Sequence, residues 1–184
     1  MKLKTIIIGK KSNLSNHLID KLNNATVISS RDIKSDVNIL SKYKNKEINL
    51  IFNNFQPATK LNVMKNSEEF TMNCIGVTSK VLDYCIDNNI NINKIIYSST
   101  AAVYGDNKFC VETDDLKPSS LHASFKIANE NLIEKFCVNN KIDYTITRIF
   151  NMYGGNDEFS IISKIFLTIK TDKKITIINN GNSI

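Results

Sequence analysis

The chain has 184 residues and carries 24 Lys and Arg against 18 Asp and Glu, a formal net charge of +6. This length suits one domain or one domain with a small appendage, and the scattered positive charge suits anionic ligands while arguing against a nucleic-acid partner. No apolar segment is long enough for a signal peptide or a membrane span, and the four cysteines lack the spacing of a metal site or a disulfide frame, so we expect a cytoplasmic protein with reduced thiols, no membrane partner and no metal.

Short apolar runs alternate along the chain with segments of helical spacing. The predicted strands are residues 5–8, 26–29, 49–53, 94–98, 144–148 and 175–178. The predicted helices are residues 13–22, 68–88, 120–138 and 159–169. Uninterrupted apolar strands separated by helices are typical of a parallel sheet that is covered on both faces. We therefore predict an α/β fold built on a doubly wound parallel sheet.

The first predicted strand runs into a turn within the sequence IIIGKKSNLSNHLI. In nucleotide-binding α/β folds this turn is rich in glycine, because backbone N–H groups and the helix dipole receive a diphosphate there. Gly9 stands where the tight turn needs it, but Ser12 and Ser15 occupy the next two positions at a spacing of three. Each serine adds a side chain where glycine would allow the closest approach. An alternative role for Ser12 is to cap the following helix.

The second predicted strand is followed by the sequence VISSRD. Nicotinamide cofactors are distinguished at this point, since an acidic residue favours the free ribose 2′-hydroxyl of NAD and a basic one favours the 2′-phosphate of NADP. Arg31 therefore favours NADP, while Asp32 directly after it leaves NAD open. The alternative interpretation is a charged turn without a ligand.

A set of motifs follows in a fixed order in the second half of the chain. YSSTAAVYG comes first, then VET and Pro118, then LHASFKIANE with His122, Lys126 and Glu130, and finally RIFNMYG. Together with MNCIGVTSKVLD upstream, this order and spacing closely resembles the extended short-chain dehydrogenases, the NAD(P)-dependent epimerase/dehydratase family that acts on nucleotide sugars. The resemblance covers nearly the whole chain. It implies a Rossmann-type fold and an epimerase, dehydratase or reductase that transfers hydride at a sugar carbon.

The resemblance also implies a set of catalytic residues. In this family a tyrosine takes the proton of the sugar hydroxyl, a Ser or Thr at a strand end holds that hydroxyl, and a lysine one helical turn after the tyrosine lowers the tyrosine pKa. Thr100 corresponds to the hydroxyl donor and Lys126 to the lysine, but His122 occupies the tyrosine position. A neutral His122 could act as the base, because a neighbouring ammonium disfavours imidazolium. The alternative is that His122 marks a site no longer under catalytic demand.

Further positions are implied to contact the cofactor and the substrate. The implied cofactor-binding positions are Gly9, Ser12, Leu14, Arg31, Asp36, Val37, Phe55, Ser98, Lys126 and Ile149. Asn151 is implied to bind the phosphates of the nucleotide sugar.

The end of the chain, ITIINNGNSI, resembles the strand and turn that introduce the substrate lobe of the family. We therefore expect a dinucleotide-binding domain at residues 1–156 and the start of an incomplete substrate-binding lobe at residues 157–184, in a fragment of a longer protein or in a reduced homologue. In the family, the helices predicted at 68–88 and 120–138 form a four-helix bundle between two subunits, which implies a homodimer. The alternative to an enzyme is a weak or inactive Rossmann module that binds a dinucleotide or a protein partner.

Overall fold

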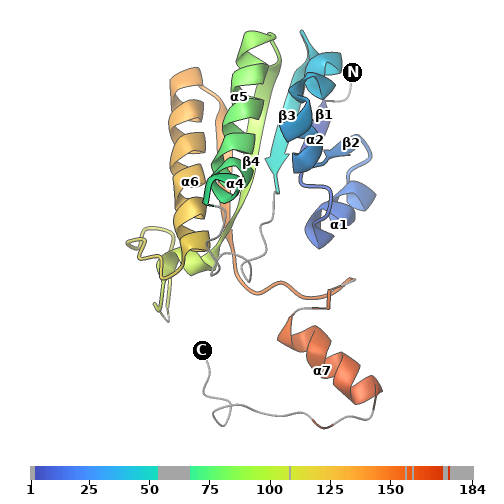
Figure 1. Cartoon of the computed structure of the whole chain (residues 1–184), viewed down its shortest axis with the longest axis vertical. Helices are drawn as coiled ribbons and strands as arrows, with labels where there is room; N and C mark the ends of the chain where they lie inside the picture. The colour runs from blue at the N-terminus through green and yellow to red at the C-terminus, as the bar shows by residue number, and fades with distance from the viewer. Residues whose placement is uncertain are drawn as a thin grey trace. The chain divides into compact units, whose positions relative to one another are not determined.

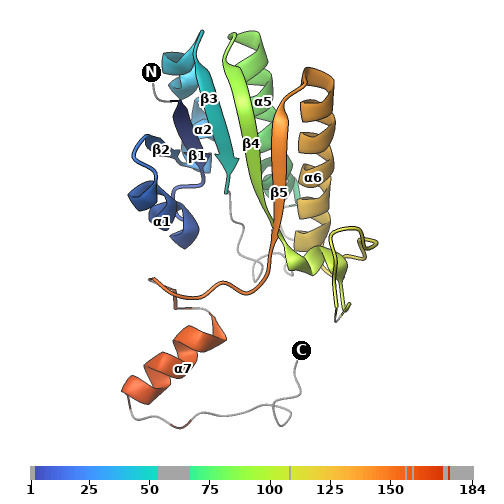
Figure 2. The same ribbon diagram turned by 180° about the vertical axis from the view of Figure 1, so that it is seen from behind.

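The computed structural model describes residues 3–53, 67–107, 109–155, 157, 158, 160–171 and 174. It divides into two compact units, Met1–Phe150 and Asn151–Ile184, and each is considered by itself. The first unit holds a sheet flanked by helices, as Figure 1 and Figure 2 show from opposite sides. The second unit contains helix α7 (Ile161–Lys170). The domain boundary after residue 156 stays a prediction.

The sheet of the first unit is parallel throughout. Its strands are β1 (Lys4–Ile8), β2 (Ala25–Ile28), β3 (Glu47–Phe52), β4 (Asn91–Thr100) and β5 (Asp143–Ile149). They are arranged in the order β2-β1-β3-β4-β5. The direction in which the chain adds strands therefore reverses at β1, between its neighbours β2 and β3. In open α/β sheets, ligands bind at the carboxyl ends of the strands on either side of such a switch point.

The core follows from the apolar strands. Ile6, Ile7 and Ile8 of β1 are all completely buried. Because successive strand residues point to opposite faces, this run shows that both faces of β1 are covered. Ile95 and Tyr97 of β4 extend the core toward β5.

Helices connect the strands. They are α1 (Asn13–Lys21), α2 (Ser30–Ser35), α4 (Ser67–Thr71), α5 (Val77–Asp87) and α6 (Leu121–Asn140), with 3-10 turns η1 (Val37–Tyr43) and η3 (Ala101–Tyr104). α2, α5 and α6 lie on the same face of the sheet in Figure 1 and behind it in Figure 2. The Rossmann-type α/β fold predicted from the sequence is confirmed.

A π-helical turn, η2 (Met72–Gly76), joins α4 to α5 in one continuous helical segment. Its Cys74 carbonyl accepts a hydrogen bond of 2.6 Å from Nδ2 of Asn129 in α6. Turns of this kind are rare and often mark functional regions. The periodicity of residues 68–88 predicted a single helix and did not reveal this turn.

Two other elements differ from the sequence prediction. α2 was not predicted, because its six residues are too few for an apolar period; the side chain of Ser29 begins this helix by accepting from the Arg31 N–H at 3.1 Å. β4 begins at Asn91 and is therefore longer than the predicted strand 94–98, since Asn91 and Asn93 are exposed and alternate with buried Ile92. The strand predicted at 175–178 lies outside the described residues.

The cysteines all have free thiols, with Cys74, Cys85 and Cys137 buried and Cys110 partly exposed. Over the ranges of the chain that the structure describes, no helix is both long enough and apolar enough to cross a membrane.

The Gly105→Ala variant should be clearly less stable than the parent. Gly105 ends the YSSTAAVYG motif with a φ of +67°, and a Cβ there would lie 2.2 Å from the Lys117 carbonyl oxygen. Both the positive φ and this clash oppose a side chain, so we expect the free energy of unfolding to fall by at least about 2 kcal/mol in urea denaturation. Gly154→Ala is the matched control, because Gly154 has a φ of +101° but no atom within 4 Å of such a Cβ. Equal losses in the two variants would contradict the steric argument.

Candidate functional site

The carboxyl edge of the sheet brings together residues that are distant in sequence. Gly9 follows β1, Asn53 follows β3, Thr100 ends β4 and Ile149 ends β5. Because the strands are parallel, all of these ends lie at the same edge, and Thr100 and Ile149 are direct partners in the ladder. This is the edge at which parallel α/β sheets bind their ligands.

Lys126 of α6 provides a buried cation at this edge. Its side chain is only 8% exposed, its Nζ donates to the Ser98 carbonyl at 2.7 Å, and the same nitrogen lies 4.9 Å from the centroid of the Tyr97 ring. Burial lowers the pKa of the ammonium to about 8, against the opposing effect of Cys74 and Glu130. A buried ammonium is costly, and such perturbed groups concentrate at functional sites. Among the predicted site residues, Lys126 is therefore hydrogen-bonded to the backbone of Ser98.

His122 lies one helical turn before Lys126, in the first turn of α6. Burial, and to a smaller extent the positive charge of Lys126, lower the pKa of its imidazole from 6.5 to about 4. His122 is therefore neutral at neutral pH. It can accept a proton, but with a pKa of about 4 it is a weak base.

Thr100 lies two residues beyond Ser98 on the same strand. Its Oγ1 accepts a hydrogen bond of 3.3 Å from the Ala102 N–H and so caps η3. A hydroxyl that accepts one hydrogen bond still has its own proton to donate. The capping role therefore leaves Thr100 able to donate to a ligand hydroxyl.

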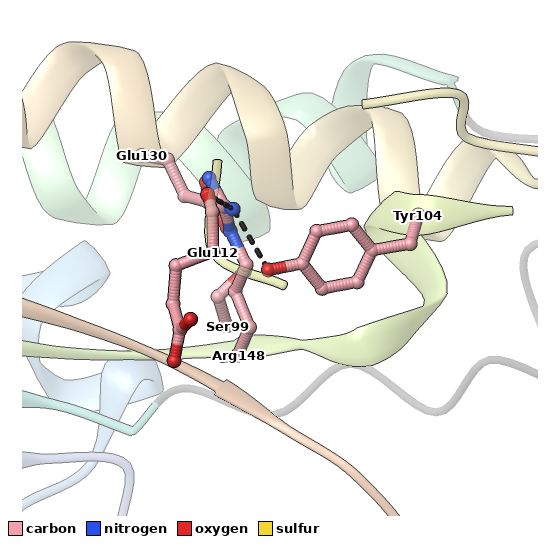
Figure 3. A network of polar contacts seen from close by, with 5 residues as sticks. All are labelled: Ser99, Tyr104, Glu112, Glu130 and Arg148. Carbon is pink, nitrogen blue, oxygen red and sulfur yellow. Dashed lines mark hydrogen bonds and ion pairs between the residues drawn. The ribbon is translucent and has the colours of Figure 1, made fainter. Parts of the chain in front are cut away.

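A polar network ties α6 to β5 and to the segment after η3 (Figure 3). Arg148 Nη2 lies 2.9 Å from Glu130 Oε2, and Arg148 Nη1 donates to the Tyr104 hydroxyl and to the Glu112 carbonyl, each at 3.0 Å. The Ser99 hydroxyl donates to Oε1 of the same carboxylate. Burial works to lower the pKa of Arg148, but the hydrogen bonds to Glu130 and Tyr104 outweigh it and raise that pKa. The network fixes the ends of β4 and β5 against the helix that carries Lys126.

The turn after β1 is bound to the end of β3 through Asn53. Asn53 Nδ2 donates to Ser12 Oγ at 2.9 Å and to Ser15 Oγ at 2.8 Å. Asn53 is 5% exposed and Ser15 is completely buried. Ser12 precedes α1 but its side chain makes no capping hydrogen bond, so the alternative role of a helix cap is wrong for this side chain. Gly9 has a φ of +127°, which glycine adopts readily.

Sequence reasoning did not identify Asn53 as a site residue. Its serine partners lie 41 and 38 residues earlier in the chain. The only available signal was its position as the last residue of the strand predicted at 49–53.

The predicted cofactor positions after β2 have local structural contacts. Arg31 is exposed in the first turn of α2. Asp36 caps η1 by accepting from the Asn38 N–H at 2.9 Å, and Val37 packs against the hydrophobic core. Asp36 and Val37 therefore stabilise the fold locally, Asp36 as a helix cap and Val37 as a core contact.

The other predicted positions are more scattered. Leu14 is half-buried in α1. Phe55 lies outside the described residues. Asn151 is exposed and belongs to the second unit, and its implied role in binding the substrate phosphates stays a prediction.

Comparisons with known proteins give a consistent picture. Residues 5–184 match the NAD dependent epimerase/dehydratase family. The bifunctional polymyxin resistance protein ArnA of Wigglesworthia glossinidia brevipalpis is 28% identical over 169 residues, which cover 82% of this chain and 25% of that protein. The chain thus spans about a quarter of the length of this curated relative.

Two solved structures of similar fold are nucleotide-sugar enzymes. UDP-N-acetylglucosamine 4-epimerase from Methanobrevibacter ruminantium M1, in complex with UDP-N-acetylmuramic acid, has a TM-score of 0.78 at 22% identity and is matched over 96% of this chain and 66% of its own. UDP-glucuronic acid 4-epimerase from Bacillus cereus, in complex with UDP-glucuronic acid and NAD, has a TM-score of 0.75 at 21% identity, over 97% of this chain and 67% of its own. At these identities the likeness concerns the fold.

Proposed function

The chain belongs to the NAD dependent epimerase/dehydratase family, and on that premise we propose that it binds NAD or NADP and acts on a nucleotide sugar by hydride transfer at a sugar carbon. The observation that carries the proposal is the buried Lys126 ammonium, held against the Ser98 carbonyl at the carboxyl end of β4. Burying an ammonium costs stability, and charged groups perturbed in this way concentrate at functional sites. The choice of a UDP-sugar as substrate class is supported by the ligands of the two solved enzymes.

Each candidate catalytic residue has a distinct role in this proposal. A bound nicotinamide would accept a hydride from the sugar and return it. The Thr100 hydroxyl would donate to the sugar hydroxyl, and the neutral imidazole of His122 would take the proton of that hydroxyl. Lys126 would donate to the ribose of the cofactor and would keep His122 unprotonated.

The preference for NAD or NADP depends on the residues at the start of α2. Arg31 and Asp32 are both exposed there, directly beyond the end of β2. The guanidinium would attract the 2′-phosphate of NADP, and the carboxylate would accept from the 2′-hydroxyl of NAD. We propose NADP as the preferred cofactor because a phosphate next to Arg31 gains a charge-assisted hydrogen bond.

A second candidate function is favoured by one observation. With an imidazole pKa of about 4, His122 accepts a proton much less readily than an ordinary histidine does. The second candidate is therefore a protein that binds the dinucleotide, and the nucleotide sugar where the rest of the pocket is present, without turning the sugar over. Under either function, the proposed homodimer would form through α5 and α6, which lie side by side in Figure 1.

The test combines binding with a pair of His122 variants. Titration with NADH and NADPH should show binding of at least one of them, and binding of neither would overturn the proposed function. The H122Y variant should oxidise UDP-glucose, UDP-glucuronic acid or UDP-N-acetylglucosamine at least about tenfold faster than the parent, because a phenol supplies the acid/base group at the family position. H122F is the matched control, since it differs only by the hydroxyl, and it should be inactive.

The pH dependence of the parent gives an independent check. Activity should rise with pH as His122 loses its proton near pH 4, and it should fall above pH 8 as Lys126 loses its charge. Cofactor binding without turnover by the parent and by H122Y alike would favour the second candidate function.

A further inference from the structure

The Asn53 side chain occupies the switch point of the sheet. Its backbone N–H donates to the Ile8 carbonyl at 2.8 Å, which places the residue between the ends of β1 and β3. The side chain then reaches the two serines that stand where the turn would carry glycine. One amide therefore connects β3 to the turn after β1 and to helix α1.

The hydrogen-bond directions leave one donor for a ligand. A carboxamide NH2 group has two protons, and Asn53 uses one on each serine oxygen. Because both serine oxygens act as acceptors toward Asn53, the hydroxyl protons of the serines must point away from it. Ser15 is completely buried, so its hydroxyl serves as an internal anchor for α1. Ser12 is partly exposed and does not cap α1, so its proton can reach a ligand at the turn.

We propose that Asn53 is a positioning residue that holds the Ser12 hydroxyl as a hydrogen-bond donor to the diphosphate of the dinucleotide. The inference rests on the proposed function, which supplies the diphosphate at this turn. The Ser12 side chain fills space that a glycine would leave empty. It also adds a hydroxyl donor, and the buried Asn53 amide sets the direction of that donor. A donor held in this way needs no reordering when the anion binds.

Four variants test the donor role of Ser12 and the positioning role of Asn53. S12A removes the hydroxyl, S12G also restores the glycine, and N53D replaces the donating amide by a carboxylate of the same size that can only accept. In N53D both serine hydroxyls must turn toward the carboxylate, which withdraws the proton from the ligand. N49D is the matched control, because it adds the same charge near the other end of β3, where Asn49 already accepts from Asn93 Nδ2 at 2.9 Å.

The measurement is the affinity for NADH, NADPH and ADP-ribose by calorimetric titration of the full chain. We expect S12A, S12G and N53D to weaken binding about tenfold or more, the effect of one lost hydrogen bond to a charged group, while N49D binds as the parent does. The loss caused by N53D should be at least about threefold smaller in the S12A background, because neighbouring residues that act through one another are not additive. Urea midpoints within error of the parent would separate this role from a general loss of structure.

Each outcome decides the inference. Parent-like affinity in S12A, tighter binding in S12G than in the parent, or an equal N53D loss with and without the Ser12 hydroxyl would overturn it while leaving the proposed function intact. A parent protein that binds neither dinucleotide would overturn the proposed function and this inference together.

Discussion

Replacing Arg148 with Met is expected to lower the free energy of unfolding by about 3–5 kcal/mol, the cost of leaving a buried charge without its partner. Glu130 is 3% exposed, and Arg148 is its ion-pair partner at 2.9 Å. The variant would also remove the donor to the Tyr104 hydroxyl and to the Glu112 carbonyl. Urea denaturation followed by circular dichroism measures the loss.

Replacing one partner of this ion pair should cost more stability than replacing the other. The side chain of Arg148 is 21% exposed against 4% for Glu130, so a guanidinium without its partner keeps some contact with water. E130Q should therefore cost less than R148M. The double variant should recover more than half of the R148M loss, since no charge is then left buried. A loss below about 1 kcal/mol in R148M would show that the ion pair behaves like an exposed one.

Replacing Lys126 with Met should abolish dinucleotide binding and yet make the fold more stable. Methionine keeps an unbranched side chain of similar length without the charge, and the pKa of about 8 shows that the folded protein disfavours the ammonium. After the loss of the hydrogen bond to Ser98, we expect a gain of about 1–2 kcal/mol in the free energy of unfolding at pH 7. K135M, at an exposed position on the same helix, is the control and should leave binding unchanged.

The stability gain of K126M should decrease as the pH rises. The ammonium pKa is about 8 in the folded protein and 10.5 in the reference state. Between these values the unfolded chain binds more protons, so the stability of the parent increases as pH rises through this window. Below pH 8 both states are protonated and the parent bears the full cost. The advantage of K126M should therefore shrink from pH 8 to pH 10, and a constant difference would argue against a buried ammonium.

Within the described residues, the sequence predicted strands β1 to β5 and the long helices well, because an apolar period is a local property that burial enforces. Motif order likewise singled out Lys126 and Thr100. The contacts of Asn53 and the pairing of Glu130 with Arg148 could not be predicted by periodicity, since they join positions that only the folded sheet brings together. The lowered pKa of His122 depends equally on burial, which a sequence does not report.

The hydrogen bond from Asn129 to the Cys74 carbonyl holds α6 against the helical segment that joins α4 to α5. Apolar helix faces resist separation but tolerate small sliding, whereas one short hydrogen bond between two helices fixes their relative position along the helix axes. Asn129 lies three residues beyond Lys126, so the same bond also fixes the height of the ammonium above the end of β4. Sliding α6 by a single residue, about 1.5 Å, would break both bonds at once. The π-helical turn thus holds the helix that carries the candidate site through one of its backbone carbonyls.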